Sequence, residues 1–145
     1  MLMDQCFGTA DFYSRNLEVL GHEATEVVAN CEPLQRRFAI EHGLKLEGKW
    51  ELVRRRGWIP WLHRCDSWFY PILLAQVQQF RPDVVHVQDM NLIKPDFLRS
   101  IRPYVRVITG QIACPIAKGT DFQEYDLVLS SFPHFVDRFR NDGLM

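Results

Sequence analysis

The sequence lacks the patterns that mark membrane-spanning, secreted and nucleic-acid-binding proteins. No apolar run approaches the roughly 18 residues that a transmembrane helix needs. The opening MLMDQCFGTADF has no basic segment followed by an apolar one, so it does not resemble a signal peptide. The formal net charge is −1, which gives no reason to expect a nucleic-acid partner. We therefore expect a cytoplasmic protein without a membrane span.

Cysteine is sparse, and its distribution argues against a disulfide framework and against a metal site. The four cysteines are far apart in the sequence, at positions 6, 31, 65 and 114. None belongs to a CxxC pair, and none has a histidine at the spacing of metal ligands. We therefore expect reduced thiols, no bound metal and no other cofactor.

Glycine-rich phosphate-binding loops are also missing. A doubly wound domain normally opens with a strand, and the turn after that strand carries such a loop. This sequence contains no GxGxxG or GxxxxGK and begins close to a predicted helix, with only Gly8 in the corresponding place. We therefore expect that the natural first strand precedes this sequence. The closing RNDGLM also stops where a further strand is expected.

The remaining sequence alternates helical and strand patterns. Apolar periodicity, with proline in the first turns and glycine at the ends, indicates the helices. The helices are expected over residues 9–20, 33–43, 67–80, 95–101 and 133–143, and the strands over 23–29, 84–87, 105–110 and 127–131. Residues 121–126 are expected to form a helical turn.

This order predicts an α/β protein. Strands that alternate with helices and are apolar throughout are typical of a parallel sheet covered on both faces. We expect one three-layer, Rossmann-like domain over residues 1–145, with a mostly parallel sheet and helices on both faces. Within it, residues 44–66 are expected to be an irregular aromatic and basic loop containing three tryptophans and Arg54–Arg56.

Polar residues follow the predicted strands, where ligands bind in open parallel sheets. The substrate-binding candidates are Gln88, Asp89, Gln111, Ser130 and His134, with Asn91 nearby. Amides and hydroxyls suit neutral hydroxylated ligands, and His134 begins the last helix. Polar residues are common wherever a strand meets solvent, so a purely structural role stays open for each. No catalytic residue can be assigned from the sequence.

One hypothesis concerns PDVVHVQDMNLIKPDFLRSIR, which resembles the third strand and following helix of response-regulator receiver domains. The resemblance implies that Asp89 accepts a phosphoryl group and that Thr109 supplies the next hydroxyl. The family also needs an acidic pair after its first strand and a Lys-Pro after its last, where this sequence has LVLSSFP. Without them the phosphoryl group has no cation or charge partner.

A broader set of motifs resembles the N-terminal domain of GT-B glycosyltransferases, closest to the spore-maturation-type or family-1-like branch. The motifs are FYSRNLEVLGHEATEVVAN, LLAQVQQFRPDVVHVQD, VITGQIACP and YDLVLSSFPHFVDRFRNDG. They occur in the family's order and cover most of the chain outside the tryptophan-rich loop.

This resemblance implies an acceptor-side domain in an enzyme that transfers a sugar from a nucleotide-sugar. A second, C-terminal domain would hold most of the donor, and no metal would be obligatory. We expect the present chain alone to release no diphosphate from nucleotide-sugars. A missing first strand would favour a homodimer, which size-exclusion chromatography would detect.

A third hypothesis is a non-catalytic domain that binds a sugar, a nucleotide or another protein. Trp50, Trp58, Trp61 and Trp68 suit sugar stacking or a protein interface, although tryptophans can equally cover a sheet. Quenching of tryptophan fluorescence by sugars would separate these two roles.

Overall fold

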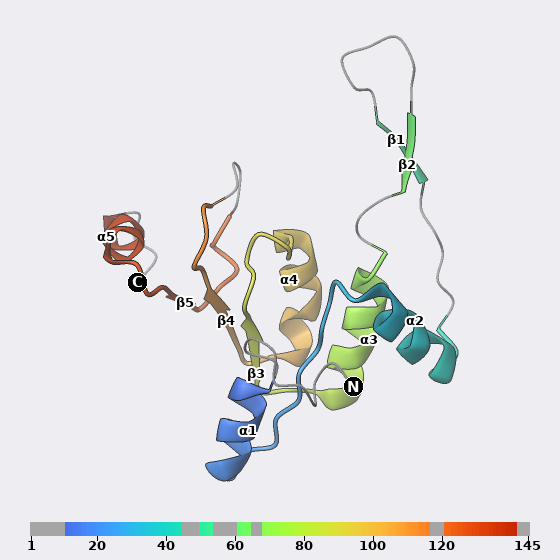
Figure 1. The fold of residues 1–145 in the computed structure, drawn as a ribbon, viewed down its shortest axis with the longest axis horizontal. Coiled ribbons are helices and arrows are strands. Elements are labelled where there is room, and N and C mark those ends of the chain that lie inside the picture. Colours follow the sequence, from blue (N-terminus) through green and yellow to red (C-terminus); the bar gives the residue numbers. More distant parts are fainter. Residues whose placement is uncertain (1–10, 45–49, 54–60, 65–67, 117–120, 142–145) are drawn as a thin grey trace. The chain divides into compact units, whose positions relative to one another are not determined.

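The computed structural model describes residues 11–44, 50–53, 61–64, 68–116 and 121–141. They belong to two compact units, Met1–Lys45 and Leu46–Met145. Figure 1 labels the helices and strands and colours them along the sequence. The single domain expected over residues 1–145 stays a prediction. No helix among the described residues is both long enough and apolar enough to cross a bilayer.

The first unit contains two of the predicted helices, α1 (Phe12–Val19) and α2 (Glu32–Glu41). Gly21 and Gly43 follow these helices with φ of +86° and +64°. Left-handed backbone of this kind favours glycine, which explains why both helices end where the sequence predicts.

The strand predicted over residues 23–29 is not formed, so this prediction is wrong. Polar groups of the segment bind the flanking helices instead of another strand. Glu26 Oε1 accepts hydrogen bonds from the backbone N–H and the hydroxyl of Ser14, at 3.2 and 3.1 Å. The carbonyl of Val28 accepts one from Gln35 Nε2 at 3.0 Å. These local bonds take the place of a strand ladder despite the β-branched residues.

The prediction of an irregular loop over residues 44–66 is wrong at two places. Strands β1 (Trp50–Val53) and β2 (Trp61–Arg64) pair antiparallel, with Trp50 opposite Arg64 and Val53 opposite Trp61. Arg54–Arg56 and Trp58 lie outside the described residues. The glycine, proline and tryptophan residues of this segment interrupt any regular strand pattern, so the sequence did not predict these paired strands.

The second unit also contains a three-stranded parallel sheet, which confirms the predicted α/β class. Its strands are β3 (Val84–Val87), β4 (Val107–Gln111) and β5 (Leu127–Leu129), in that spatial order. Parallel pairing sets Val87 beside Gly110, and Gln111 beside Leu129.

Four helical segments lie before, between and after these strands in the sequence. Helices α3 (Tyr70–Phe80) and α4 (Pro95–Ile101) flank β3. The 3₁₀ helix η1 (Arg102–Tyr104) leads into β4, and α5 (Pro133–Asn141) follows β5. The predicted helical turn over residues 121–126 is an ordinary turn.

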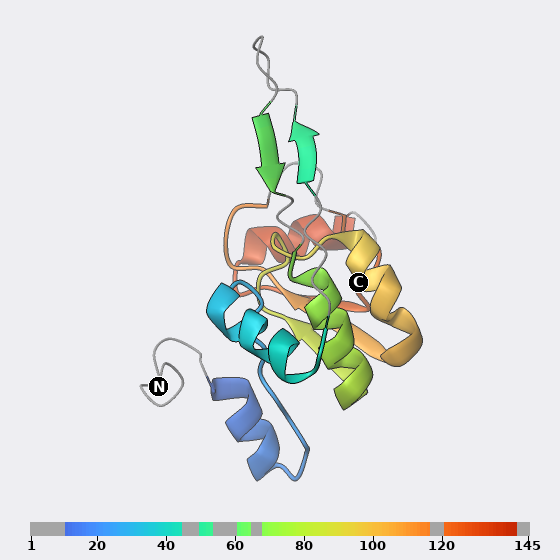
Figure 2. The ribbon, with the colours of Figure 1, turned by 90° about the vertical axis from the view of Figure 1, so that its right-hand side faces the viewer.

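One face of this sheet forms the main core together with α3 and α4, which lie side by side in Figure 2. Tyr70 of α3 stacks on Phe97 of α4, with ring centroids 4.9 Å apart. The buried side chains include Ile72, Leu73, Leu98, Ile101, Ile108 and Val128. The alternation along each strand places the buried residues on this face.

The opposite face of the sheet is only partly covered. Val84 keeps 53% of its surface exposed, and Val107, Leu127 and Leu129 are also exposed. His86 and Thr109 lie between them on the same face, because side chains alternate along each strand. This face therefore contributes less to the apolar burial that stabilises the unit than the face toward α3 and α4.

The carboxylate of Asp126 connects the first residues of β4 to the helical segment that precedes them. Its Oδ2 accepts hydrogen bonds from the backbone N–H of Ile108 at 2.7 Å and from Arg102 Nη1 at 2.6 Å. Arg102 Nη2 also donates to the carbonyl of Glu124 at 2.6 Å. One carboxylate thus joins η1, β4 and the approach to β5.

These bonds give a prediction about acid stability. The Arg102 and Ile108 donors lower the pKa of Asp126, because they favour the ionised form. Its contribution is present above the pKa of an unfolded aspartate, about 3.9, and is lost as pH falls through the lower folded pKa. We expect Asp126→Asn to lower the free energy of unfolding by about 1 kcal/mol at neutral pH, since the side chain is half-exposed.

Urea denaturation from neutral to acidic pH would check this. The difference between wild type and Asp126→Asn should shrink as the carboxylate becomes protonated. Asp137→Asn, which changes an exposed carboxylate on α5, is the matched control. A difference that stayed constant down to the lowest pH would contradict the assigned role.

Candidate functional site

The carboxyl ends of β3, β4 and β5 form one edge of the sheet, here called the rim. The strands are parallel, so residues at or just after their last positions share this edge. Gln88 and Asp89 follow β3, Gln111 ends β4, and Ser130 follows β5. The structure therefore brings these four predicted residues to one edge, while His134 lies in the first turn of α5.

Asp89 lies in an exposed turn with a defined local geometry. Its Oδ1 accepts a hydrogen bond from the backbone N–H of Asn91 at 3.0 Å, and its carbonyl accepts one from Leu92 at 3.2 Å. An aspartate that bonds two residues ahead is a common way to fix such a turn. The carboxylate still has capacity to accept further hydrogen bonds.

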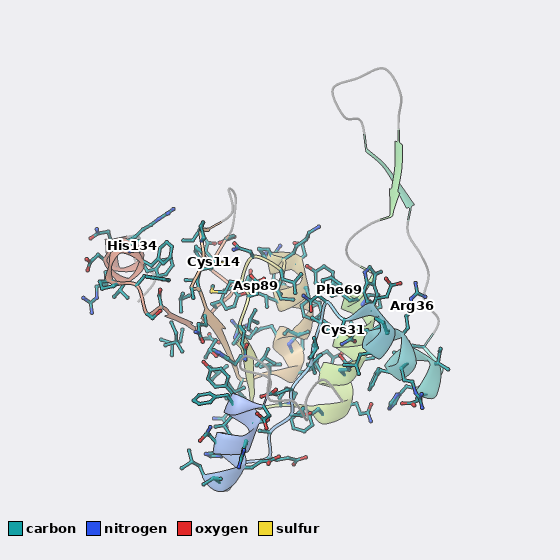
Figure 3. All side chains as sticks on the ribbon, in the orientation of Figure 1. Cys31, Arg36, Phe69, Asp89, Cys114 and His134 are labelled. Atoms are coloured by element: carbon teal, nitrogen blue, oxygen red, sulfur yellow. The ribbon has the colours of Figure 1, made fainter. Side chains whose placement is uncertain are left out.

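Asn91 joins this turn to the loop after β4. Its Nδ2 donates to the carbonyl of Pro115 at 3.1 Å and contacts Cys114 Sγ at 3.2 Å. Figure 3 labels Cys114, the residue that Asn91 contacts, and Asp89, which begins the turn. Cys31 and Cys114 are free thiols, whereas Cys6 and Cys65 lie outside the described residues. The amide of Asn91 therefore fixes part of the rim.

The side chain of Gln111 lies on the partly covered face of the sheet and hydrogen-bonds a neighbouring side chain there. Its side chain hydrogen-bonds His86, and Nδ1 of His86 lies 2.8 Å from Thr109 Oγ1. Burial lowers the pKa of His86, and the bond to Gln111 opposes that shift. Gln111 is therefore at the rim by position, but its amide takes part in a polar cluster within the sheet.

The hydroxyl of Ser130 forms hydrogen bonds with two backbone groups. It donates to the carbonyl of Ile112 at 2.9 Å and accepts from the N–H of Phe132 at 3.2 Å. These bonds hold the loop after β4 against the loop after β5. Ser130 thus has a clear structural role, and its predicted role in binding a ligand stays a prediction.

His134 forms part of an exposed aromatic group. Its ring centroid lies 4.3 Å from that of Phe135 and 5.6 Å from that of Phe132. Phe132 is 40% exposed, and His134 is exposed as well. Such rings offer faces on which a sugar or another planar group can stack.

Two tyrosines near the rim were missed by the sequence analysis. The hydroxyl of Tyr70 donates to the carbonyl of Leu92 at 3.2 Å and accepts from the N–H of Lys94 at 2.9 Å. Tyr125 is buried, and its hydroxyl has no hydrogen-bond partner within the described ranges. Burial raises the pKa of Tyr125 well above its ordinary value, and nearby Tyr70 and the negative charge of Asp89 add to the effect.

Gly110 makes room for the ring of Tyr125. A Cβ at this position would lie 2.7 Å from Met90 Sδ and 2.8 Å from Tyr125 Cε1. Glycine inside a strand often marks such a close approach, and this was the one signal for the contact in the sequence. Tyr125 itself comes before β5, so the rule about strand ends could not find it.

Within the ranges that the structure describes, no three His, Cys, Asp or Glu side chains are grouped in a way that could hold a metal ion. No protein-family model, curated protein or solved structure matches the chain. The residues of the rim are therefore the basis for assigning a function to the chain.

Proposed function

We propose that the chain is the acceptor-side domain of a glycosyltransferase of the GT-B type. Such an enzyme would move a sugar from a nucleotide-sugar to a hydroxylated acceptor, with most of the donor held by a second domain. The observation that supports this best is the parallel order of β3, β4 and β5, which sets Gln88, Asp89 and Ser130 along one rim. The sequence resemblance to GT-B domains is the other support.

The chemistry of the rim suits a neutral sugar better than an anion. Asp89 and Gln88 are exposed and offer carboxylate and amide groups to ligand hydroxyls. Phe132 and His134 add exposed rings after β5. A phosphate would meet the negative charge of Asp89, which disfavours it at this position.

The other two hypotheses have less support. A receiver-like role for Asp89 needs a group of acids around it, and the described residues contain no such group. A non-catalytic binding domain rests on the tryptophans, and among these only Trp68 has a described side chain, which is part-buried and packs edge-on against Phe69.

Binding of neutral glycosides tests the proposal. Methyl glycosides and nucleotide-sugars would be titrated into ¹⁵N-labelled chain, and amide shifts followed by NMR. We expect glycosides to shift the amides of Gln88, Asp89 and His134. Asp89→Ala should weaken binding about tenfold, as expected for the loss of a hydrogen bond to a charged group.

Asp83→Ala is the matched control for this titration. Asp83 is also an exposed aspartate, but it precedes β3 and faces Arg106 at 3.5 Å, at the opposite end of the strand from Asp89. It should bind glycosides as the wild type does. The proposal is wrong if no glycoside or nucleotide-sugar shifts the amide signals of the rim residues. It is also wrong if Asp89→Ala and Asp83→Ala weaken binding equally.

A further inference from the structure

The start of α5 carries a group of aromatic rings that extends from the surface into the core. Phe132 is 40% exposed, and its ring packs edge-on against Phe135 with the centroids 5.9 Å apart. Phe135 in turn stacks on the buried Phe139 at 6.1 Å. These contacts restrict the ring of Phe132, so a ligand that stacks on it would need little further ordering of the protein.

Ser130 holds the backbone of this aromatic group at the rim. Its hydroxyl accepts a hydrogen bond from the N–H of Phe132 at 3.2 Å and donates one to the carbonyl of Ile112 at 2.9 Å. The N–H of Ile112 also donates to the carbonyl of Leu129 at 3.0 Å. The segment that carries Phe132 is thereby held against the loop that follows β4.

The same loop separates Phe132 from Asp89. On the side of β3, Asn91 Nδ2 donates to the carbonyl of Pro115 at 3.1 Å, and the N–H of Asn91 donates to Asp89 Oδ1 at 3.0 Å. Strands β3 and β5 each pair with β4, so they lie two strand spacings apart, about 10 Å. This separation exceeds the length of one sugar ring, so a monosaccharide reaches Asp89 or Phe132, one at a time.

The two positions suit different parts of a sugar. The exposed carboxylate of Asp89 accepts hydrogen bonds from sugar hydroxyls. The exposed ring of Phe132 offers an apolar surface against which the C–H groups of a sugar ring can pack. A linear neutral oligosaccharide has both kinds of group in each of its units and is long enough to reach both positions.

We propose that the rim holds two subsites, a polar one at Asp89 and a stacking one at Phe132, and that its ligand is a linear neutral oligosaccharide. This inference rests on the proposed function, which makes the oligosaccharide the acceptor. Residues 113–115 are exposed in the loop between the two subsites, where the bound chain of sugars would pass. Phe132 is then the residue that selects a longer acceptor over a monosaccharide.

The proposal predicts that affinity rises with the length of the ligand. Methyl glycosides of glucose, galactose and mannose, and linear trisaccharides of the same sugars, would be titrated into the ¹⁵N-labelled chain. We expect at least one trisaccharide to bind roughly two- to tenfold more tightly than the matching methyl glycoside, the range for one aromatic contact. The amide shifts of Asp89 and His134 provide the measurement.

Substitutions of Phe132 identify the source of this gain. Phe132→Ala and Phe132→Leu should abolish the gain, because neither side chain has a ring, and Phe132→Tyr should keep it. Binding of methyl glycosides, followed at the amide of Asp89, should be the same in all three variants. Asp89→Ala should weaken the binding of both lengths of ligand.

Phe80→Ala is the matched control. Phe80 is 37% exposed, nearly as much as Phe132. It ends α3 and comes just before β3, so it lies toward the opposite end of that strand from Asp89. We expect Phe80→Ala to keep the full gain with trisaccharides. Urea denaturation of each variant would show that a lost gain does not come from unfolding.

The outcomes separate this proposal from the proposed function. If methyl glycosides bind at Asp89 and no trisaccharide binds more tightly, the two subsites are overturned and the glycosyltransferase proposal stands. The same holds if the gain survives in folded Phe132→Ala or Phe132→Leu, or is lost equally in Phe80→Ala. If no saccharide of either length shifts the amides of the rim residues, both proposals are wrong.

Discussion

Replacing Gly110 with alanine is expected to lower the free energy of unfolding by about 1–3 kcal/mol, the usual range for overpacking a core. The added methyl group would lie 2.7 Å from Met90 Sδ and 2.8 Å from Tyr125 Cε1. Both side chains are buried, so neither can move without disturbing its own packing. Met90 follows Asp89, and the substitution should therefore also weaken the proposed binding of glycosides at the rim.

A double-mutant cycle with Met90→Ala would identify the cause. If the methyl group meets the Met90 side chain, the double variant should be more stable than the sum of the two single effects predicts. Urea denaturation of the four proteins gives the coupling free energy. Effects that add within about 0.5 kcal/mol would mean that Gly110 and Met90 are not in conflict.

The second large effect is expected for Phe139→Ala in α5, at about 3–5 kcal/mol. Phe139 is 2% exposed, and its ring centroid lies 5.2 Å from that of Phe122, in the loop before β5. It also stacks on Phe135 at 6.1 Å. Removing the ring leaves a cavity at the contact that holds α5 against the rest of its unit.

Phe132→Ala provides the control for this experiment, because it changes the same residue type at an exposed position. We expect it to change the free energy of unfolding by less than about 1 kcal/mol. Thermal or urea denaturation would compare the two. Equal effects of the two substitutions would contradict the packing of α5 on Phe122.

The sequence predicted those parts of the fold in which local pattern and tertiary packing agree. VVHV lies between Pro82 and a polar turn, and it forms β3 as expected. The segment 23–29 has the same β-branched character, but side chains of Ser14 and Gln35 bind its polar groups. Such competition depends on three-dimensional neighbours that a strand pattern does not reveal.

The same limit applies to the candidate site. The strand-end rule correctly located Gln88, Asp89 and Ser130 at one rim, because it depends only on parallel order. It could not show that the hydroxyl of Ser130 binds backbone groups of two loops. It also could not find Tyr125, whose ring reaches the rim only because Gly110 has no side chain.

The contact between Asn91 and the loop at Cys114 and Pro115 has a mechanical consequence. Two loops that follow different strands are coupled, so a displacement of one is transmitted to the other. Cys114 is exposed, and a small fluorophore attached to its thiol would stand beside Asn91, whose amide contacts the sulfur. Such a label would report optically on movements that the two loops make together.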